Sequence, residues 1–186
     1  MLTHSILQSV ETPNLILREI CAEDRFDLAG FMTQARYQKF ISHKLKNLDE
    51  VTEFVRRQVG VQGDGRRRVY HLAAEERISC EVVGDGFLIN HQNHALELGW
   101  GMHPALWSMG FGTEIGRALL GVGFEKLMAK SMWCKIMGSN KRSARLANRI
   151  GLQLTKTDPA YPVGQGRLEQ VDIYSITAEQ YFDLPY

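Results

Sequence analysis

The sequence lacks the features that mark several specialised classes of protein. Its 186 residues contain only three cysteines, Cys21, Cys80 and Cys134, an odd number without paired spacing. This argues against a disulfide framework and against a zinc ribbon. No apolar run approaches the length of a membrane-spanning helix, and the first residues show no basic region followed by an apolar run. We therefore expect a protein of the reducing cytoplasm, with Cys80 and Cys134 as buried, inert thiols.

The chain also lacks an excess of charge of either sign. Lysine and arginine number 22 against 21 acidic residues, so the formal net charge is +1. A balanced surface predicts neither a nucleic-acid-binding protein nor a protein of the membrane surface. With 44% hydrophobic and 23% charged residues, the composition is that of a globular protein. The length predicts one domain covering residues 1–186.

Hydrophobic periodicity predicts strands and helices in alternation. The expected strands are residues 15–20, 69–74, 78–89, 95–101, 132–137, 152–156 and 168–176. Helices are expected after Asp24, after a capping box at Asn47 and Glu50, and over residues 113–129, 141–150 and 178–182. Residues 158–166, which contain two prolines and two glycines, are expected to form a loop. The order predicts a single α/β (α+β) domain with a mixed, mostly antiparallel sheet, one parallel crossover and helices on both faces.

Three local patterns admit more than one interpretation. The basic triplet Arg66-Arg67-Arg68 is interpreted as a solvated patch beside a strand rather than a phosphate contact. Two glycines within residues 78–89 suggest a bulge or a break. His91 and His94, followed by Glu97, invite a metal site, but two isolated ligand types are a weak signal. We favour a polar hairpin turn there and expect no metal.

The most informative stretch runs from Trp107 to Glu114, where a glycine-bearing turn follows a strand and opens a helix. Backbone N–H groups and the helix dipole predict an anion site at such a turn, best suited to phosphate. A Walker loop requires Gly-Lys-Ser/Thr, whereas Gly112 is followed by Thr113 and Glu114. A dinucleotide fingerprint requires a third glycine where Ile115 stands. ATP and dinucleotides are therefore not the expected ligands.

A third phosphate-binding design fits this stretch. Trp-Ser-Met-Gly-Phe-Gly-Thr-Glu at residues 107–114, after Gly99-Trp100 and Pro104, resembles the acetyl-CoA loop of the GNAT superfamily of N-acetyltransferases. It is most similar to the branch that acetylates the N-termini of ribosomal proteins. Asn140, Ser143 and the pair Gly151-Leu152 resemble the family's second motif, an Asn-x-x-Ser helix. Because Ala147 stands where many members have a tyrosine acid, that acid is absent here.

The resemblance implies a GNAT-like domain with acetyl-CoA as cosubstrate and assigns roles to particular residues. The residues implied to contact acetyl-CoA are Met102, Trp107, Met109, Gly110, Phe111, Gly112, Thr113, Asn140 and Ser143. Backbone N–H groups of the loop would hold the pyrophosphate, and residues 101–102 would lie along the pantetheine arm. Ser143 is the candidate acid for the departing thiolate, with helix capping as its alternative role.

Two further residues are candidates for the acceptor side of the reaction. Strand alternation places Glu97 with Ala95 and Gly99, opposite Leu96 and Leu98. Glu97 is the candidate base, and a solvated strand face or a salt bridge is its alternative role. Tyr161 is expected to line the acceptor site, with surface packing as the alternative. Basic residues 141, 142 and 145 are expected either to meet the nucleotide 3′-phosphate or to solvate their helix.

The expected function is transfer of the acetyl group of acetyl-CoA to a primary amine, with the α-amine of a peptide N-terminus as the first choice of acceptor. A small amine, such as a polyamine, an amino-antibiotic or an amino acid, is the first alternative. A non-catalytic acyl-CoA-binding module is the second, since fold does not fix function. The expected partners are acetyl-CoA and the amine, without nucleic acid or membrane, and a homodimer stays open.

Overall fold

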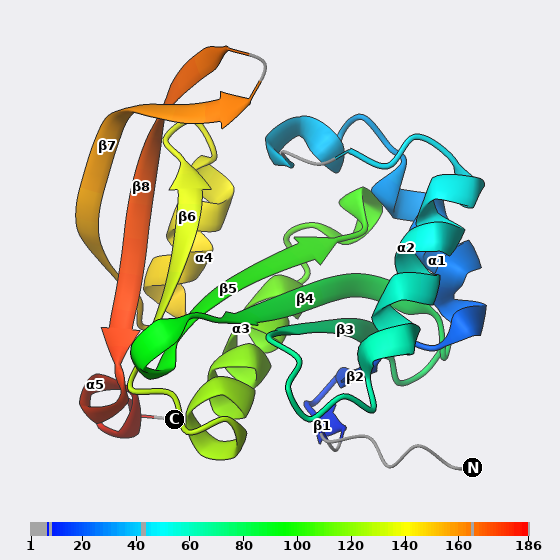
Figure 1. Cartoon of the computed structure of the whole chain (residues 1–186), viewed down its shortest axis with the longest axis horizontal. Coiled ribbons are helices and arrows are strands. Elements are labelled where there is room, and N and C mark those ends of the chain that lie inside the picture. Colours follow the sequence, from blue (N-terminus) through cyan, green and yellow to red (C-terminus); the bar gives the residue numbers. More distant parts are fainter. Residues whose placement is uncertain (1–6, 8, 42–43, 165, 186) are drawn as a thin grey trace.

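The computed structural model describes residue 7 and residues 9–41, 44–164 and 166–185, with the backbone alone at residue 92. The described strands form one eight-stranded sheet in the order β1-β2-β3-β4-β5-β6-β8-β7 (Figure 1). The strands are β1 (Val10–Glu11), β2 (Leu15–Glu19), β3 (Val69–Glu76), β4 (Val82–Asn90), β5 (Ala95–Met102), β6 (Ser131–Met137), β7 (Gln153–Gly164) and β8 (Arg167–Thr177). The α-helices are α1 (Arg25–Met32), α2 (Leu48–Val61), α3 (Phe111–Gly121), α4 (Lys141–Arg149) and α5 (Ala178–Phe182).

Every described strand pair is antiparallel except β5 and β6, which are parallel. The predicted crossover is therefore confirmed, with α3 as its helix. The predicted order of elements is also confirmed, apart from the two-residue strand β1, which is too short to leave a pattern in the sequence. α3 continues into a π-helical turn, Val122–Lys126.

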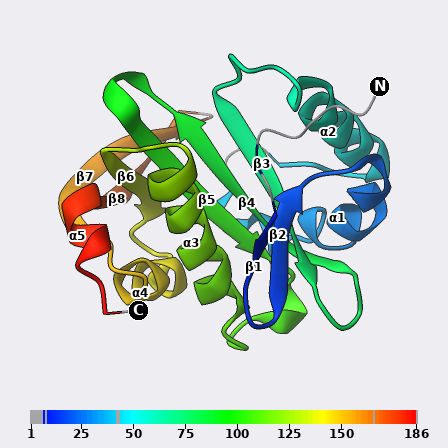
Figure 2. The ribbon, with the colours of Figure 1, turned by 90° about the horizontal axis from the view of Figure 1, so that it is seen from below.

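Helices cover both faces of the sheet, as predicted (Figure 2). On one face, α1 and α2 bury Leu28, Phe31, Val51 and Val55 against the sheet. On the other face, α3 buries an apolar stripe in the main core of the protein; this stripe includes Ile115, Leu119 and Leu120. Toward one end of the sheet, β5 and β6 diverge (Figure 1).

Local chemistry explains where two of these helices begin and end. The Asn47 side chain accepts a hydrogen bond from the Glu50 backbone N–H at 2.9 Å, so the predicted cap of α2 is confirmed. The residue after α4 and its last turn, Gly151, has φ +97°, a value that only glycine adopts without strain. In the described chain, no helix has both the length and the apolar character needed to span a membrane.

The glycines of β4 lie beside the predicted bulge and also permit close packing. A Cβ at Gly86 would lie 2.8 Å from Leu119 of α3, and a Cβ at Gly84 would lie 2.8 Å from the Gly101 carbonyl oxygen. These glycines let α3 and β5 approach β4 closely. The predicted bulge is also present. Ala74 of β3 pairs with Gly84 and Glu75 pairs with Val82, so Val83 is the extra residue of β4, directly before Gly84.

Two sequence predictions about the surface are wrong. Cys80 is exposed, not buried, because the turn between β3 and β4 falls later than predicted and takes Ile78 out of the strand, where it is 92% exposed. Arg67 is not solvated: its guanidinium is buried, pairs with Glu19 and lies over the Tyr70 ring. Cys134, in contrast, is buried as predicted.

The segment expected to be a loop, residues 158–166, is largely strand. β7 runs to Gly164 and pairs with β8, with register shifts that take up its irregular residues. A strand can contain Pro159 and Pro162 here because β7 is an edge strand of the described sheet, where a missing N–H removes no ladder bond. Tyr161 is therefore held on a strand.

Candidate active site

The candidate site lies where β5 and β6 separate. The two strands pair only from Ala95–Glu97 to Ser131–Trp133. Beyond Glu97, β5 stays with β4 as far as Met102, whereas β6 stays with β8 as far as Met137. The gap between them is the centre of a cleft of about 1360 Å³ that is lined by both strands and by residues from both faces of the sheet.

One end of the cleft is formed by the turn that precedes α3. The Trp107 indole N–H donates to the Met102 carbonyl at 3.1 Å and so ties the turn to the end of β5. Ser108 and Gly110 have φ values of 77° and 95°. The buried Phe111 side chain anchors the first residue of the helix in the core. The turn is thus fixed by contacts at both of its ends.

This turn leaves backbone donors at the start of α3. The first N–H groups of a helix have no acceptor within it. The N–H groups of Thr113 and Glu114 are taken by the Gly110 carbonyl at 2.8 and 3.3 Å. Those of Phe111 and Gly112 have no acceptor among the described residues. Two free donors at a positive dipole end make an anion site.

The start of α4 lies beside the start of α3. A Cβ at Gly112 would lie 2.8 Å from Leu146, and one at Gly116 would lie 2.7 Å from Ile150. Both contacts advance in the same direction along the chain, so the two helices run side by side in parallel. Their positive ends therefore reinforce each other.

Side chains of α4 add to this positive field and line the same end of the cleft. The cations of α4 that line the cleft are Lys141, Arg142, Arg145 and Arg149. Arg142 lies over the Trp107 ring at 4.0 Å, and Arg149 reaches the Thr113 hydroxyl at 3.4 Å. Asn140 caps α4 by accepting from the Ser143 N–H at 3.2 Å. Since Asn140 is the cap, Ser143 is not, and its hydroxyl has no hydrogen-bond partner among the described residues.

Glu97 lies at the point where the strands part. Leu96 and Leu98 are 1% exposed on the opposite face, so the predicted alternation is confirmed. One carboxylate oxygen of Glu97 lies 3.0 Å from His91 Nε2, and the other lies 3.7 Å from Lys135 Nζ. Glu97 is thus both a cleft residue and a member of a salt-bridge cluster.

The floor of the cleft contains a thiol that does not ionise near neutral pH. Burial raises the pKa of Cys134 to about 12, and the negative charge of Glu97 adds to the effect. A thiolate is the nucleophilic form of cysteine. Cys134 therefore cannot act as an acyl-accepting nucleophile at neutral pH.

A buried polar network supports the wall on the α1–α2 side, and sequence reasoning missed it. The Tyr37 hydroxyl donates to Asp85 at 2.6 Å, and His71 Nε2 lies 2.8 Å from the other oxygen of Asp85. Burial, and then the charge of Asp85, hold the pKa of Tyr37 well above its usual value. A Cβ at Gly101 would collide with both Tyr37 and Asp85. No spacing links these positions in the sequence, so no signal could have found them.

Most of the residues expected at the site share this cleft. Its lining includes Glu97, Met102, Trp107, Gly110, Gly112, Thr113, Asn140, Ser143 and Tyr161. Two expected cofactor contacts do not line it. The Met109 side chain is 60% exposed and its N–H donates to the Leu106 carbonyl at 3.4 Å, whereas the Phe111 side chain lies in the core. Only the backbone N–H of Phe111 is available at the site.

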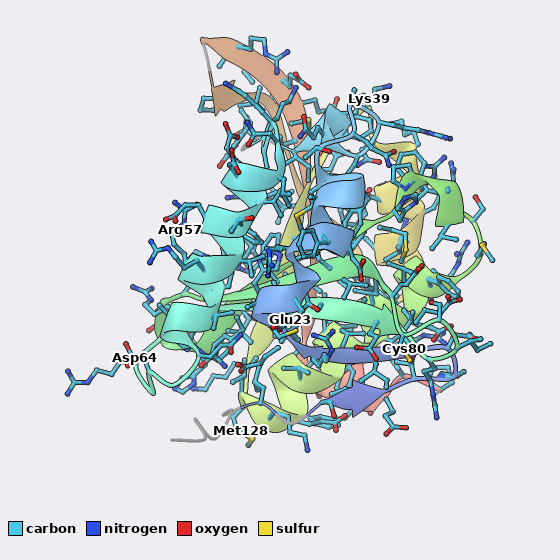
Figure 3. All side chains as sticks on the ribbon, turned by 90° about the vertical axis from the view of Figure 1, so that its right-hand side faces the viewer. Glu23, Lys39, Arg57, Asp64, Cys80 and Met128 are labelled. Carbon is cyan, nitrogen blue, oxygen red and sulfur yellow. The ribbon has the colours of Figure 1, made fainter. Side chains whose placement is uncertain are left out.

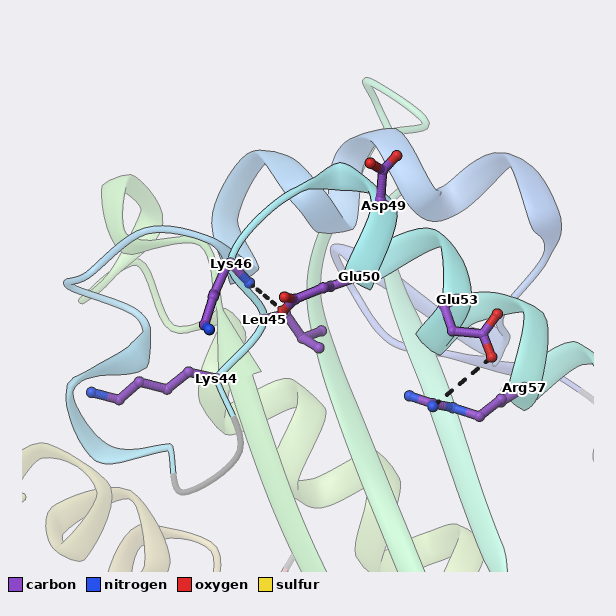
Figure 4. Close-up of a pocket in the computed structure, with 7 residues that line it drawn as sticks. All are labelled: Lys44, Leu45, Lys46, Asp49, Glu50, Glu53 and Arg57. Atoms are coloured by element: carbon purple, nitrogen blue, oxygen red, sulfur yellow. Dashed lines mark hydrogen bonds and ion pairs between the residues drawn. The ribbon is translucent and has the colours of Figure 1, made fainter. Parts of the chain in front are cut away.

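Neither a metal site nor the second hollow of the protein competes with this cleft. In the described part of the chain, no three His, Cys, Asp or Glu side chains are grouped to hold a metal ion. The second hollow, of about 520 Å³, lies beside the first turns of α2 (Figure 4). Its three cations and three carboxylates balance, and Arg57 pairs with Glu53 at 3.9 Å. Its lining therefore carries no net charge that would attract an ionic ligand.

Comparison with known proteins identifies relatives of this chain. Residues 14–153 match the family model described as an acetyltransferase (GNAT) domain. The chain is similar to an uncharacterised N-acetyltransferase, p20, from Bacillus licheniformis, with 22% identity over 94% of this chain and 99% of the relative.

Solved structures share the fold at low sequence identity. A GNAT-family acetyltransferase from Bacillus anthracis superposes with a TM-score of 0.84 at 17% identity, covering 92% of this chain and 99% of the other. A ribosomal-protein-S5-alanine acetyltransferase from Vibrio fischeri gives 0.80 at 12% identity, with 94% and 99% covered. Spermidine N-acetyltransferase from Vibrio cholerae, solved with CoA and spermine, gives 0.78 at 15% identity, with 92% and 100% covered.

Proposed function

The chain belongs to the GNAT acetyltransferases, and from this premise we propose that it acetylates the α-amine of a peptide or protein N-terminus. It is an acyltransferase of the N-acetyltransferase type. The observation that carries the proposal is the cleft between β5 and β6, which connects a phosphate-binding end at two helix starts to a carboxylate, Glu97. The two ends match a CoA thioester and the amine that attacks it.

The phosphate-binding end has the chemistry that CoA requires. The free N–H groups of Phe111 and Gly112 suit the pyrophosphate, and the cations of α4 suit its charge and that of the 3′-phosphate. The edge of β5 near Met102, open toward the cleft, suits the amides of the pantetheine arm in the manner of an added strand. When bound, acetyl-CoA supplies an activated acetyl group as a thioester.

The residues near the point where the strands part supply proton transfer. An amine attacks only after losing a proton, and Glu97 is the carboxylate in the lining that is able to accept it, directly or through a water. We assign donation of a proton to the departing thiolate to Ser143, because its hydroxyl has no partner among the described residues and Ala147 offers no proton. Because the Cys134 thiol is not ionised, we propose direct attack in a ternary complex.

The acceptor is the least constrained part of this proposal. Among the structures that share the fold, one is named for a ribosomal-protein acceptor and another for spermidine. A shared fold does not decide between these two kinds of acceptor. We favour the peptide because the two facing walls of the cleft carry apolar and aromatic side chains. These are Phe40 and Ile41 from the segment between α1 and α2, and Tyr161, Pro162 and Val163 from β7. The proposed location is the reducing cytoplasm, which suits the free, exposed thiol of Cys80.

Thiol release from acetyl-CoA tests the proposal. We expect release with peptides that begin with serine or alanine, acetylated at the α-amine by mass spectrometry. A panel of polyamines, amino-antibiotics and amino acids serves as the comparison. Tight binding of acetyl-CoA without thiol release from any amine would reject the enzyme in favour of a binding module.

A further inference from the structure

The lining of the active-site cleft is strongly positive, although the chain is nearly neutral. Among the described lining residues, seven side chains are cationic and one, Glu97, is a carboxylate. The cations are Arg36, Lys39, Lys135, Lys141, Arg142, Arg145 and Arg149. The net charge of the whole chain is +1. Positive charge is therefore concentrated at the cleft, where it acts on whatever enters.

The cofactor accounts for only part of this charge. The four cations of α4 stand beside the start of α3, at the end of the cleft that we assign to the phosphates of CoA. Lys135 stands at the other end, but it already pairs with Glu97 at 3.7 Å. Two cations of another segment remain: Lys39, and Arg36, which lies over the Trp107 ring beside Arg142 and so borders the phosphate end.

Arg36 and Lys39 belong to a different wall of the cleft. Both lie in the segment between α1 and α2, which faces the β7–β8 hairpin across the opening (Figure 1). Lys39 lies at the upper end of the molecule, far from Asp64 and Cys80 (Figure 3). Arg36 lies over the Trp107 ring at 4.7 Å, and Lys39 lies over the Phe40 ring at 5.2 Å. Neither has an acidic partner within 4 Å among the described residues.

We infer that the acceptor is a peptide N-terminus followed closely by acidic side chains, which Arg36 and Lys39 attract. This inference rests on the proposed function and narrows its substrate. Because Glu97, Arg36 and Lys39 line the same cleft, an acceptor that extends from Glu97 along the α1–α2 wall brings an acidic side chain to these two cations. A polyamine would bring a second ammonium group to the same wall, where the described lining offers no carboxylate besides Glu97, which is assigned to the reacting amine. Like-charge contact penalises the polycation, and opposite charge favours the acidic peptide.

The test compares peptides that differ only in charge. Three peptides begin with Ser-Ala and carry two glutamates, two glutamines or two arginines at the next positions; arginine adds charge without adding an acetylatable amine. Spermidine is the fourth acceptor. The readout is kcat/KM for thiol release at saturating acetyl-CoA and low salt. We expect the glutamate peptide to exceed the arginine peptide about tenfold, and the ratio to shrink at high salt.

Charge reversal tests the assignment to this wall. Lys39→Glu and Arg36→Glu should each move the glutamate-to-arginine ratio toward one. Because the ratio is measured within one variant at saturating acetyl-CoA, a change in cofactor affinity cancels. Arg66→Glu is the matched control: Arg66 is exposed and lies outside the cleft lining, and this variant should keep the wild-type ratio.

The outcomes distinguish acetyl transfer itself from the preference for an acidic acceptor. Equal use of the three peptides, or a preference for spermidine or the arginine peptide, overturns the charge inference and leaves acetyl transfer standing. An unchanged ratio in both charge-reversal variants also overturns it. Absence of thiol release from every amine overturns the inference together with the proposed function.

Discussion

Gly112 of α3 and Leu146 of α4 are in such close contact that a Cβ added to the glycine would lie 2.8 Å from the leucine Cδ1. This contact, repeated one turn later by Gly116 and Ile150, aligns two helix starts at one end of the cleft. The anion site is therefore a property of the packing between α3 and α4 as well as of the turn before α3.

Replacing Gly112 by valine should separate the two helix starts. We expect a loss of about 1–3 kcal/mol in unfolding free energy and at least a tenfold weaker affinity for acetyl-CoA by calorimetry. The double variant Gly112→Val with Leu146→Ala should recover part of both losses. Gly60→Ala is the control, since nothing lies within 4 Å of its added Cβ, and its affinity should be that of the wild type. Full affinity in Gly112→Val would contradict the role of this contact.

Gly110 is needed for its backbone conformation rather than for space. Its φ is +95°, and an added Cβ would meet nothing within 4 Å. A β-branched residue disfavours this conformation, so Gly110→Val should turn the N–H groups of residues 111 and 112 away and abolish acetyl-CoA binding. Gly110→Asn should lose less, because asparagine tolerates positive φ better. Calorimetry that finds equal affinities for Gly110→Val and the wild type would reject the loop as the phosphate site.

Removing the hydroxyl of Ser143 should affect turnover more than binding. The Ser143 N–H, which Asn140 caps at 3.2 Å, remains in Ser143→Ala, so the helix start is retained. We expect kcat to fall about 10²-fold, within the usual range for loss of an acid, and the affinity for acetyl-CoA to stay near normal. Ser79→Ala, in the β3–β4 turn, is the control. Unchanged kcat in Ser143→Ala would remove its acid role.

Glu97→Gln should slow the reaction by removing the proton acceptor while keeping the shape of the side chain. A loss of about 10²-fold in kcat is expected for a general base, with thiol release as the measurement. Glu75→Gln, a carboxylate outside the cleft that pairs with Arg18 at 2.7 Å, should retain turnover. If Glu97→Gln also retains full turnover, the carboxylate is structural, holding His91 and Lys135.

The Cys134 thiol should make stability depend on pH in the alkaline range. Its pKa is raised to about 12 in the folded protein, whereas an unfolded cysteine ionises near pH 8.5. Below that value the thiol is protonated in both states and its stabilising contribution is complete. Between these pKa values only the unfolded state loses the proton, so stability falls by about 1.4 kcal/mol per pH unit.

Urea unfolding between pH 8.5 and 10 measures this slope. Cys134→Val keeps the apolar volume and should reduce the fall in stability by about 1.4 kcal/mol per pH unit. Cys80→Ser should leave the slope unchanged because Cys80 is exposed. Equal slopes in the wild type and Cys134→Val would show that the thiol is not held protonated by burial.

The sequence by itself determined those features that depend on neighbouring residues. Periodicity located the helices and most strands, the Asn47 cap followed from its side chain, and the turn from Trp107 to Thr113 followed from the order of glycines before a helix. Local signals failed where distant contacts decided the outcome. Arg67 is buried because Glu19 compensates its charge, and residues 158–164 form a strand because β8 offers a partner to an edge.

Only the tertiary structure decided how these pieces form a site. The separation of β5 from β6 after Glu97 arises because each strand follows a different neighbour, which no segment encodes alone. The parallel approach of α3 and α4 requires glycines on one helix to meet leucine and isoleucine on the other. The two unpaired cations of the α1–α2 wall face the β7–β8 hairpin because the sheet brings together segments more than a hundred residues apart. Neighbouring residues in the sequence determined which chemical groups each segment carries. Packing between distant segments determined which of these groups meet in one cleft.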